Sequence, residues 1–213
     1  VLLTTKSCLI YGIAAGMAFL HSHGIIHRDL KIFNIYSDMF HRPKIGGFDL
    51  AIELNNKNSI KCDQIKGTPA YLAPEVYKYK EYSRKSDVYS FGLLVYEILT
   101  ARHAFGSETN PKKLKEIVMN DKIHLNFDEN PINAAYRELI EKCIKTNPNE
   151  RPSFDEILLE LKTNRDFINE DIYEDYFYKY IDFIDNNEKI SFNPEERFGF
   201  FDTIIETKLH TFQ

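Results

Sequence analysis

The chain has 213 residues, of which 43% are hydrophobic and 28% are charged. This balance is typical of a folded globular protein and excludes a disordered chain or a collagen-like fibre. A formal net charge of −5 does not indicate a nucleic-acid surface. The three cysteines are widely spaced and odd in number. We therefore expect no disulfide framework, no zinc site and a reducing, cytoplasmic location.

Charge and aromatic content divide the chain near residue 163. Residues 1–163 carry 22 basic and 20 acidic side chains, whereas residues 164–213 carry 5 basic and 12 acidic ones. The second segment also holds 12 of the 29 aromatic residues. We therefore expect one domain over residues 1–163 and an acidic, aromatic-rich tail over residues 164–213.

The first predicted element is a helix over about residues 5–22, with Gly24 as a C-cap. Its apolar stretch, from Cys8 to Leu20, is shorter than the ~20 residues needed to cross a bilayer. We therefore expect a buried helix and no membrane span. Four apolar residues form one stripe at helical spacing: Leu9, Ile13, Met17 and Leu20.

The remainder of the first 163 residues predicts a mainly α fold with a few short strands. Short β-like segments are expected at 25–26, 34–36 and 43–46, followed by an exposed polar loop at 53–66. A helix that begins at Ser86-Asp87 is apolar nearly all round, which places it in the middle of the core. Further helices are expected at about 112–120, 132–145 and 153–163, the last opened by an S-x-x-E capping box.

One segment carries a recognisable catalytic pattern. Residues 27–34 read H-R-D-L-K-I-F-N and fit the protein-kinase catalytic loop H-R-D-L-x-x-x-N. Four further kinase-like segments follow in the family's order: K-I-G-G-F-D-L-A at 44–51, G-T-P-A-Y-L-A-P-E at 67–75, S-D-V-Y-S-F-G at 86–92 and N-P-N-E-R-P-S-F at 147–154. The chain therefore resembles the C-terminal lobe of a eukaryotic protein kinase over residues 5–163.

The resemblance implies a helical C-lobe with short β strands around the catalytic and metal-binding loops. It also implies ATP, magnesium and a protein substrate, with four residues at the reacting centre. Asp29 would accept the proton of the substrate hydroxyl or orient that hydroxyl, and Lys31 would place positive charge on the transferring phosphoryl group. Asn34 would offer an oxygen to magnesium, and Thr68 would bridge the catalytic loop and the peptide site. Lys31 and Thr68 favour serine or threonine as the substrate.

The resemblance implies structural roles for five other residues. His27 would be a packing residue, Glu75 and Arg151 would form a salt bridge, and Asp87 would hold the backbone of the catalytic loop. Arg28 would pair with a phosphate on the activation loop. The candidate acceptor in that loop is Ser59, which has Lys57 and Lys61 nearby.

The metal-binding triplet departs from the family. It reads Gly47-Phe48-Asp49 where kinases have D-F-G, and glycine has no carboxylate to bind magnesium. Asp49 is the alternative metal ligand. However, two residues along an extended backbone displace a side chain by ~6.6 Å, which is large beside a magnesium–oxygen distance of ~2.1 Å.

A second departure concerns the nucleotide. No segment of the sequence resembles the family's glycine-rich loop, strand lysine or hinge, so we expect the N-terminal lobe to be absent. We expect this chain alone to be inactive. Three hypotheses stay open. The first is a serine/threonine kinase whose N-lobe is missing from the sequence and whose S-D-V-Y-S-F-G motif resembles that of the tyrosine-kinase-like group. The second is a pseudokinase-type binding or scaffold module for a partner protein, and the third is a truncated product without a function of its own.

The tail predicts two helices. Apolar residues recur every four positions in the first: Ile168, Ile172, Tyr176, Tyr180 and Ile184. The second is expected to begin at Asn193 as N-cap with Pro194 after it, and its apolar stripe is Phe198, Phe201, Ile205 and Leu209. The tail helices either fold back on the lobe or each other, or form an acidic, aromatic docking element for a partner.

Overall fold

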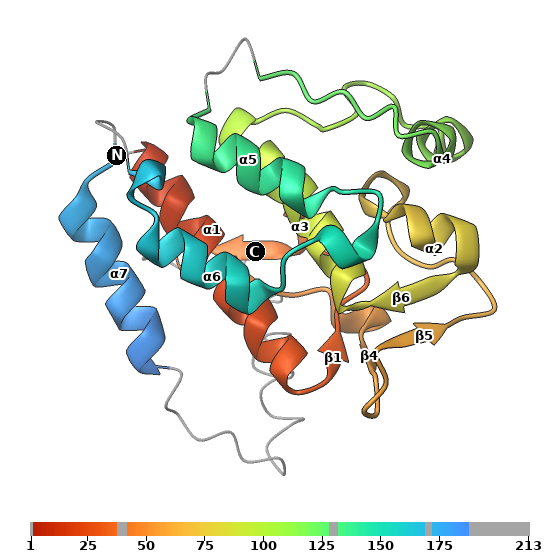
Figure 1. Cartoon of the computed structure of the whole chain (residues 1–213), viewed down its shortest axis with the longest axis horizontal. Helices are drawn as coiled ribbons and strands as arrows, with labels where there is room; N and C mark the ends of the chain where they lie inside the picture. Colours follow the sequence, from red (N-terminus) through yellow and green to blue (C-terminus); the bar gives the residue numbers. More distant parts are fainter. Residues whose placement is uncertain (1, 38–41, 128–131, 169–171, 188–213) are drawn as a thin grey trace, which may run out of the picture.

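Two helices occupy the centre of the computed structural model, which describes residues 2–37, 42–127, 132–168 and 172–187 (Figure 1). They are α1 (Leu2–Ser22) and α3 (Arg84–Thr100). The other helices of the described residues are α2 (Pro74–Tyr79), α4 (Pro111–Met119), α5 (Ala134–Cys143), α6 (Phe154–Thr163) and α7 (Glu174–Asn187). The mainly α prediction is confirmed.

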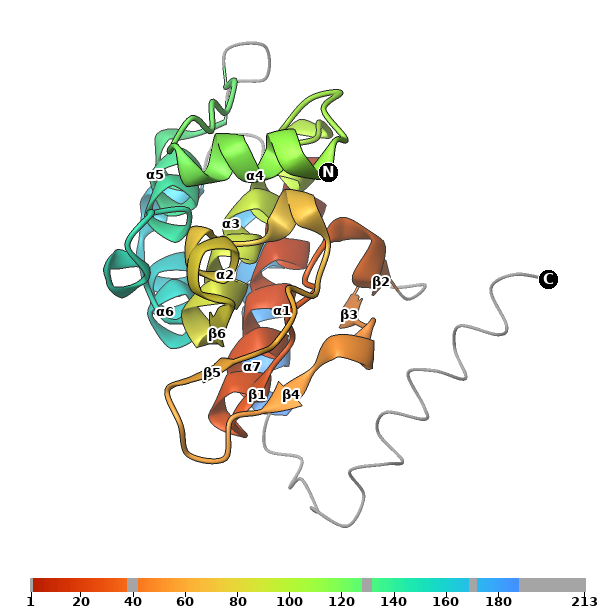
Figure 2. The ribbon, with the colours of Figure 1, turned by 90° about the vertical axis from the view of Figure 1, so that its right-hand side faces the viewer.

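Strands β2 (Ile35–Ser37), β3 (Pro43–Ile45) and β4 (Ile52–Glu53) lie on one side of α1, while α5 and α6 lie on the other (Figure 2). The other strands of the described residues are β1 (Ile25–Ile26), β5 (Ser59–Lys61) and β6 (Glu81–Ser83). The strands pair antiparallel as β1 with β4, β2 with β3, and β5 with β6. The 3₁₀ turns are η1 (Ile32–Asn34), η2 (Phe48–Leu50), η3 (Pro69–Tyr71), η4 (Pro148–Glu150) and η5 (Arg165–Phe167).

The expectation of an exposed loop over residues 53–66 is wrong in part. Strand β5 lies inside this stretch, and its Ile60 is opposite Tyr82 of β6. Only one of the three residues of β5 is apolar, because alternate side chains of a strand point to opposite faces. The polar composition therefore concealed a strand whose partner is more than twenty residues away.

Helix α3 begins at Arg84, slightly earlier than predicted, because Ser83 is its N-cap. The Ser83 hydroxyl accepts from the Lys85 backbone N–H at 3.1 Å, and the Ser86 hydroxyl accepts from the Ser83 N–H at 3.1 Å. Every residue from Ser86 to Thr100 is buried, as the apolar sequence predicts. A Cβ on Gly92 would lie 2.6 Å from the Cβ of Cys143, so glycine is what lets α3 approach α5 this closely.

Helix α1 is buried on more than one face. Residues Leu3–Ser22 are long and apolar enough to cross a membrane by length and composition, and 61% of that stretch is buried inside the fold. The helix packs against α3, α6, α7 and β3. This explains why the buried surface of α1 is wider than the single predicted stripe.

The tail helix α7 packs on α1 and shares its hydrophobic core, so the packing is continuous across the change of charge at residue 163. Its buried face contains Phe177, Tyr180 and Ile181. Tyr176 is 57% exposed, so the predicted four-residue stripe was wrong at this position. A stripe at strict four-residue spacing drifts around a helix of 3.6 residues per turn. The second predicted tail helix lies outside the described residues.

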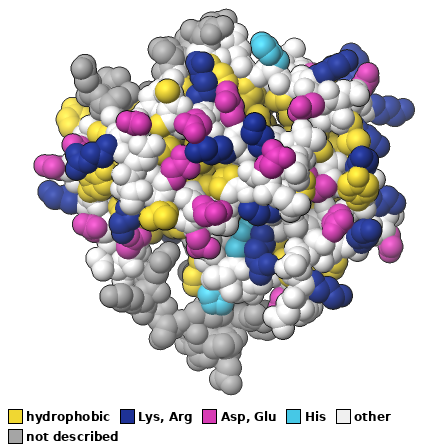
Figure 3. Space-filling model, viewed as in Figure 1, with side chains coloured by type: hydrophobic (Ala, Val, Ile, Leu, Met, Phe, Trp, Pro, Cys, Tyr) yellow, Lys and Arg dark blue, Asp and Glu magenta, His cyan; other side chains and the backbone are white. Residues whose placement is uncertain are grey.

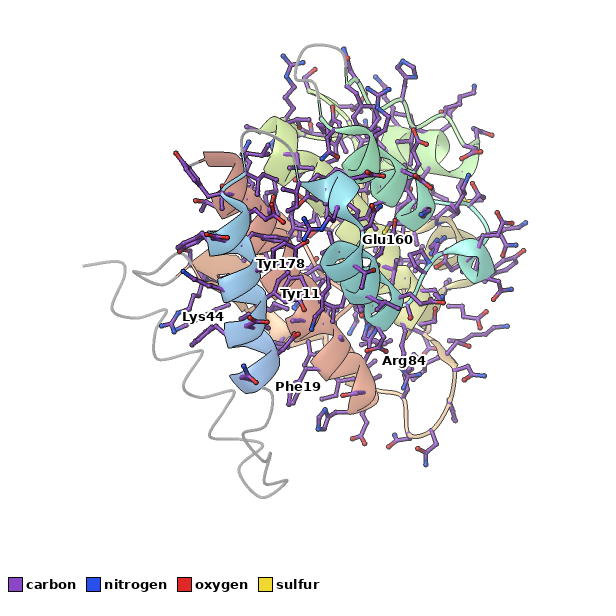
Figure 4. All side chains as sticks on the ribbon, turned by 60° about the vertical axis from the view of Figure 1, so that its left-hand side comes forward. Tyr11, Phe19, Lys44, Arg84, Glu160 and Tyr178 are labelled. Atoms are coloured by element: carbon purple, nitrogen blue, oxygen red, sulfur yellow. The ribbon has the colours of Figure 1, made fainter. Side chains whose placement is uncertain are left out.

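Polar contacts attach α7 to the domain at both ends. The Tyr11 hydroxyl on α1 donates to the Asp185 carboxylate at 2.8 Å, and the Tyr173 N–H donates to the Thr4 hydroxyl at 2.9 Å. Figure 4 shows Tyr11 where α1 faces α7. Between them, a Cβ on Gly12 would lie 2.4 Å from the Tyr180 hydroxyl oxygen. Of the two alternatives for the tail, folding back on the lobe therefore holds for α7.

Surface charge is mixed. On the face shown in Figure 3, acidic and basic side chains are interspersed with small apolar areas. The acidic excess of the chain therefore forms no single-sign patch on this face.

The packing of α7 generates a stability prediction. We expect Phe177→Ala, at a fully buried position, to lower the free energy of unfolding by about 3–5 kcal/mol. The matched control on the same helix is Tyr176→Ala, which we expect to cost less than about 0.5 kcal/mol. Urea unfolding of the full chain measures both. Equal effects for the two variants would contradict this packing.

Candidate active site

The catalytic loop connects β1 to η1, and Asp87 of α3 holds its backbone. The Asp87 carboxylate accepts from the backbone N–H of His27 at 2.8 Å and from that of Arg28 at 2.9 Å. Arg28 has a φ of 69°, a left-handed conformation that an arginine seldom adopts. Two backbone hydrogen bonds to one buried carboxylate therefore fix the turn that presents Asp29.

Two histidines complete this support. His21 of α1 contacts the same Asp87 carboxylate through Nε2 at 2.9 Å. Burial would raise the pKa of Asp87, but the contact with His21 and the hydrogen bond from the His27 N–H outweigh it and hold the pKa below its usual value. The His27 ring is fully buried; its Nδ1 accepts from the Asp29 N–H, and its Nε2 lies 2.9 Å from the Gly46 carbonyl oxygen. These side chains shape the loop and form no metal cluster among the described residues.

The Asp29 carboxylate joins the catalytic loop to the activation segment. Oδ1 accepts from the Thr68 backbone N–H at 2.9 Å and from the Thr68 hydroxyl at 2.7 Å. Oδ2 pairs with the Lys31 ammonium at 2.7 Å and accepts from the Asn34 amide at 3.2 Å. Three of the four residues that the sequence assigns to the reacting centre therefore converge on the fourth.

These contacts set the chemistry of Asp29. Burial raises the pKa of its carboxyl, but hydrogen bonds from Lys31 and Thr68 together bring the pKa below its ordinary value. A carboxylate stabilised in this way is a weak base at neutral pH, but it accepts hydrogen bonds well. The geometry therefore favours Asp29 as the group that orients a substrate hydroxyl.

Gly67 allows the activation segment to approach the loop. It has a φ of 115°, and a Cβ there would lie 2.7 Å from the Arg28 carbonyl oxygen. Any other residue would push Thr68 away from Asp29. The G-T pair in the sequence is the signal of this close approach.

The residues around Gly47 do not fit a magnesium ion held as in the family. Gly47 offers no ligand, and a Cβ at this position would lie 2.3 Å from the amide carbon of Asn34. The Asn34 amide nitrogen donates to the Asp29 carbonyl oxygen at 2.7 Å as well as to its carboxylate. Asp49 lies exposed on η2. The carboxylate that Asn34 contacts is that of Asp29, which is already bonded to Lys31 and Thr68, so the contacts of the described residues show no further carboxylate there to complete a metal site.

Arg28 and Ser59 are not brought together by a contact in the structure. The Arg28 guanidinium stacks 4.1 Å from the centre of the Tyr82 ring and donates through Nη1 to the Leu50 carbonyl. Its Nε and Nη2 are buried and have no hydrogen-bond partner among the described residues. The Ser59 hydroxyl donates to the Glu81 carboxylate, so a phosphate on Ser59 would meet a like charge. Phosphorylation of Ser59 stays a prediction.

Arg151 and Glu75 form a buried bidentate ion pair. Nη1 and Nη2 of Arg151 each donate to one Glu75 oxygen at 2.8 Å. The remaining guanidinium donors reach the carbonyl oxygens of Lys85, Lys145 and Thr146. Because all donors are used, this buried charge is fully compensated and attaches the activation segment to the segment after α5.

Sequence reasoning missed one buried polar contact near the site. The Tyr71 hydroxyl of η3 donates to the Glu97 carboxylate of α3. Burial is the main cause that raises the pKa of Tyr71, and the contact with Glu97 raises it further. The contact fixes the segment after Thr68 on the central helix. A tyrosine within the G-T-P-A-Y segment was a visible signal, but its partner could not be read from the sequence.

A hollow of about 1150 Å³ lies elsewhere, between α2, β6 and η4. Side chains of both charges line it, among them Lys78, Arg84, Glu81 and Glu150. None of the four residues of the Asp29 cluster borders it, so the hollow is separate from the candidate site.

Comparison with known families agrees with this geometry. Residues 4–161 match the model of the family described as "Protein kinase domain". The chain belongs to the protein kinase family. Kinases of this family use ATP and magnesium in general and act on protein substrates. Helix α7 lies beyond the matched residues.

Individual relatives are kinases of two kinds, dual specificity and serine/threonine. The chain is 39% identical over 153 residues to the dual specificity protein kinase shkC of Dictyostelium discoideum. The aligned stretch covers 68% of this chain and 29% of that kinase. The chain is 30% identical over 149 residues to the serine/threonine-protein kinase Nek9 of Mus musculus, covering 70% of this chain and 15% of that kinase. It is 33% identical over 156 residues to the serine/threonine-protein kinase PLK4 of Drosophila willistoni, covering 70% and 18%. The chain spans less than a third of the length of these relatives.

The lowered pKa values of Asp29 and Asp87 generate a pH prediction for this kinase domain. Because the folded-state pKa values lie below the unfolded value of about 3.9, the stabilisation is complete above that value and is lost as the pH falls through the folded values. We expect the free energy of unfolding in urea to fall as the pH drops below about 5, and to go on falling below the unfolded value of about 3.9.

The variant Asp87→Asn tests the origin of this slope. It leaves a buried N–H without a charged acceptor, and we expect a loss of about 3 kcal/mol at neutral pH and a shallower slope towards acid. The control is Asp182→Asn on the exposed face of α7, which should leave the slope unchanged. An unaltered slope in Asp87→Asn would refute the assignment.

Proposed function

We propose that this chain is part of a protein kinase that phosphorylates serine or threonine and that residues 27–34 with Thr68 form its protein-substrate side. The observation that carries the proposal is the Asp29 carboxylate, held by Lys31 at 2.7 Å and by the Thr68 hydroxyl at 2.7 Å. The relatives include both serine/threonine and dual specificity kinases. The Lys31–Thr68 pair is what supports serine or threonine for this chain.

In the proposed reaction, a substrate hydroxyl donates a hydrogen bond to Asp29. The hydroxyl oxygen would bond to the γ-phosphorus of ATP as the bond from that phosphorus to the leaving ADP oxygen breaks, and the hydroxyl proton would pass to the Asp29 carboxylate. The Lys31 ammonium lies between Asp29 and Thr68, donating to the Thr68 hydroxyl at 2.7 Å. From there it would stabilise negative charge on the transferring group.

We further propose that these 213 residues alone do not transfer phosphate. The support is Gly47, which removes the carboxylate that would bind magnesium beside Asn34, together with the lack of a segment in the sequence that resembles a phosphate-binding glycine-rich loop. Whether a longer chain with such a loop transfers phosphate is a separate question, which the proposal for these 213 residues does not decide.

The second candidate is a binding module of the pseudokinase type. Two observations favour it. The Asp29 carboxylate has all its contacts to Lys31 and Thr68, whereas Gly47 has no carboxylate to bind magnesium. Such a module would hold a protein segment without modifying it.

A cytoplasmic location also remains part of the proposal, supported by three free cysteines.

A phosphotransfer assay tests the proposed inactivity. The full chain is incubated with labelled ATP, magnesium and a mixture of serine and threonine peptides, with Asp29→Asn as the matched control. We expect no incorporation of label above that control. Reproducible incorporation that Asp29→Asn abolishes would show that this chain is an active kinase.

Position 47 provides a second test. We expect Gly47→Asp to restore no phosphotransfer and to destabilise the fold, because the new Cβ would meet the Asn34 amide at 2.3 Å. The matched control is Gly24→Asp, since Gly24 has nearly the same φ of 74° and no atom within 4 Å of its Cβ position. The control isolates the cost of a positive φ, about 1–2 kcal/mol. The prediction fails if Gly47→Asp costs no more than Gly24→Asp or gains activity.

A further inference from the structure

Helix α7 carries a line of exposed aromatic side chains. Tyr173, Tyr176 and Phe183 are 62%, 57% and 43% exposed, and they are three of the seven exposed large hydrophobic residues of the described chain. Tyr173 lies directly before α7, nearly one helical turn from Tyr176, and Phe183 is nearly two turns further on. We call these three side chains the aromatic ridge. Helix α7 lies at the edge of the molecule and packs on α1 with its other face (Figure 1), so the ridge is a candidate interaction surface.

A candidate occupant follows α7 in the chain. Residues 188–213 lie outside the described residues, and their sequence predicts a helix that begins at Asn193. Its apolar stripe includes Phe198, Ile205 and Leu209, at intervals of seven and four residues. Read from its C-terminal end, the aromatic ridge has intervals of seven and three residues. The two lines of apolar residues therefore nearly match in spacing when one runs against the other.

The connection between the two elements is short. Five residues, 188–192, separate the end of α7 from Asn193, and connections of about 2–8 residues join neighbouring antiparallel helices. The 14 residues of α7 span about 21 Å, and a helix over residues 194–209 would span about 24 Å. The segment is therefore long enough to run back along the whole ridge. Each ridge residue would then face one residue of the predicted stripe: Phe183 with Phe198, Tyr176 with Ile205, and Tyr173 with Leu209.

Charge favours this segment over a second copy of α7. Three charged residues of α7 are exposed beside the ridge, with a net charge of −1: Asp175, Lys179 and Asp182. Both aspartates directly precede a ridge residue, as Arg197 and Lys208 directly precede residues of the predicted stripe. In an antiparallel pair such positions lie on the same side of the interface, so the aspartates would face the two basic residues. Two α7 helices paired in the same way would bring two net negative flanks together, which is unfavourable.

We propose that residues 193–209 form a helix that packs antiparallel on the aromatic ridge of the same molecule. The occupant of the ridge is then the chain's own C-terminal segment, and this inference does not depend on the proposed function. Docking of one short helix is a local equilibrium, which urea removes before the domain unfolds. It therefore does not enter the free energies of unfolding that Phe177→Ala and Tyr176→Ala compare.

A pair of introduced cysteines tests the contact under native conditions in the full chain. Tyr176→Cys with Ile205→Cys places two thiols at facing positions, where a disulfide can form. The matched control is Tyr176→Cys with Thr203→Cys, because Thr203 lies on the opposite face of the predicted helix. Both pairs carry Cys62→Ser, since the other two native cysteines are buried. We expect the intramolecular disulfide to form at least about tenfold faster in the facing pair than in the control.

The charges provide a second readout on the same reaction. We expect Asp182→Arg to slow disulfide formation in the facing pair about threefold, because it places like charges together. Adding Arg197→Asp restores opposite charges and should recover the rate. The control is Glu196→Lys on the outer face of the predicted helix, which should leave the rate unchanged.

Mass spectrometry at several protein concentrations separates the outcomes. Equal rates for the two pairs overturn the inference, because an unattached segment would bring both positions to position 176 equally often. Disulfides between two molecules, which disappear on dilution, also overturn it and assign the ridge to a second copy. A rate that Asp182→Arg does not change contradicts the proposed register. All of these outcomes leave the proposed function standing.

Discussion

The buried carboxylate of Asp87 is the contact on which the candidate site depends. It comes from the central helix α3 and binds two consecutive backbone N–H groups of the catalytic loop and the ring of His21 on α1. Burying a charge is costly unless every lone pair finds a donor, and here the donors come from two other elements. One side chain therefore couples both central helices to the loop and holds Arg28 in a backbone conformation that it would not adopt alone.

Local signals in the sequence were sufficient for most helices and for the order of the site residues. The capping box at Ser153 and the all-round apolar run after Ser86 lie within single elements, so residue spacing alone predicts them. Strand β5 and the buried face of α7 depend on partners distant in sequence. Ile60 is recognisable as a strand residue only opposite Tyr82, and Phe177 is buried only because α1 lies beside it.

The candidate site shows the same division. The pattern at 27–34 names Asp29, Lys31 and Asn34, but not which oxygen each of them contacts. That depends on side-chain rotamers and on Thr68, which is brought in by the close approach at Gly67. The Tyr71–Glu97 contact was not predicted for the same reason, since it joins η3 to a distant turn of α3. The spacing of the motif residues predicts which side chains belong to the site. The contacts among those side chains depend on how the fold packs them.

The charges of the site explain how a glycine can occupy position 47. In a site with a carboxylate at this position, two neighbouring negative groups would need a cation between them. Here Asp29 is balanced by Lys31 at 2.7 Å, and the space next to Gly47 is filled by the Asn34 amide, which donates to Asp29 twice. The charge of Asp29 is thus balanced by Lys31 without a metal ion, so glycine at position 47 leaves no unpaired negative group beside Asn34.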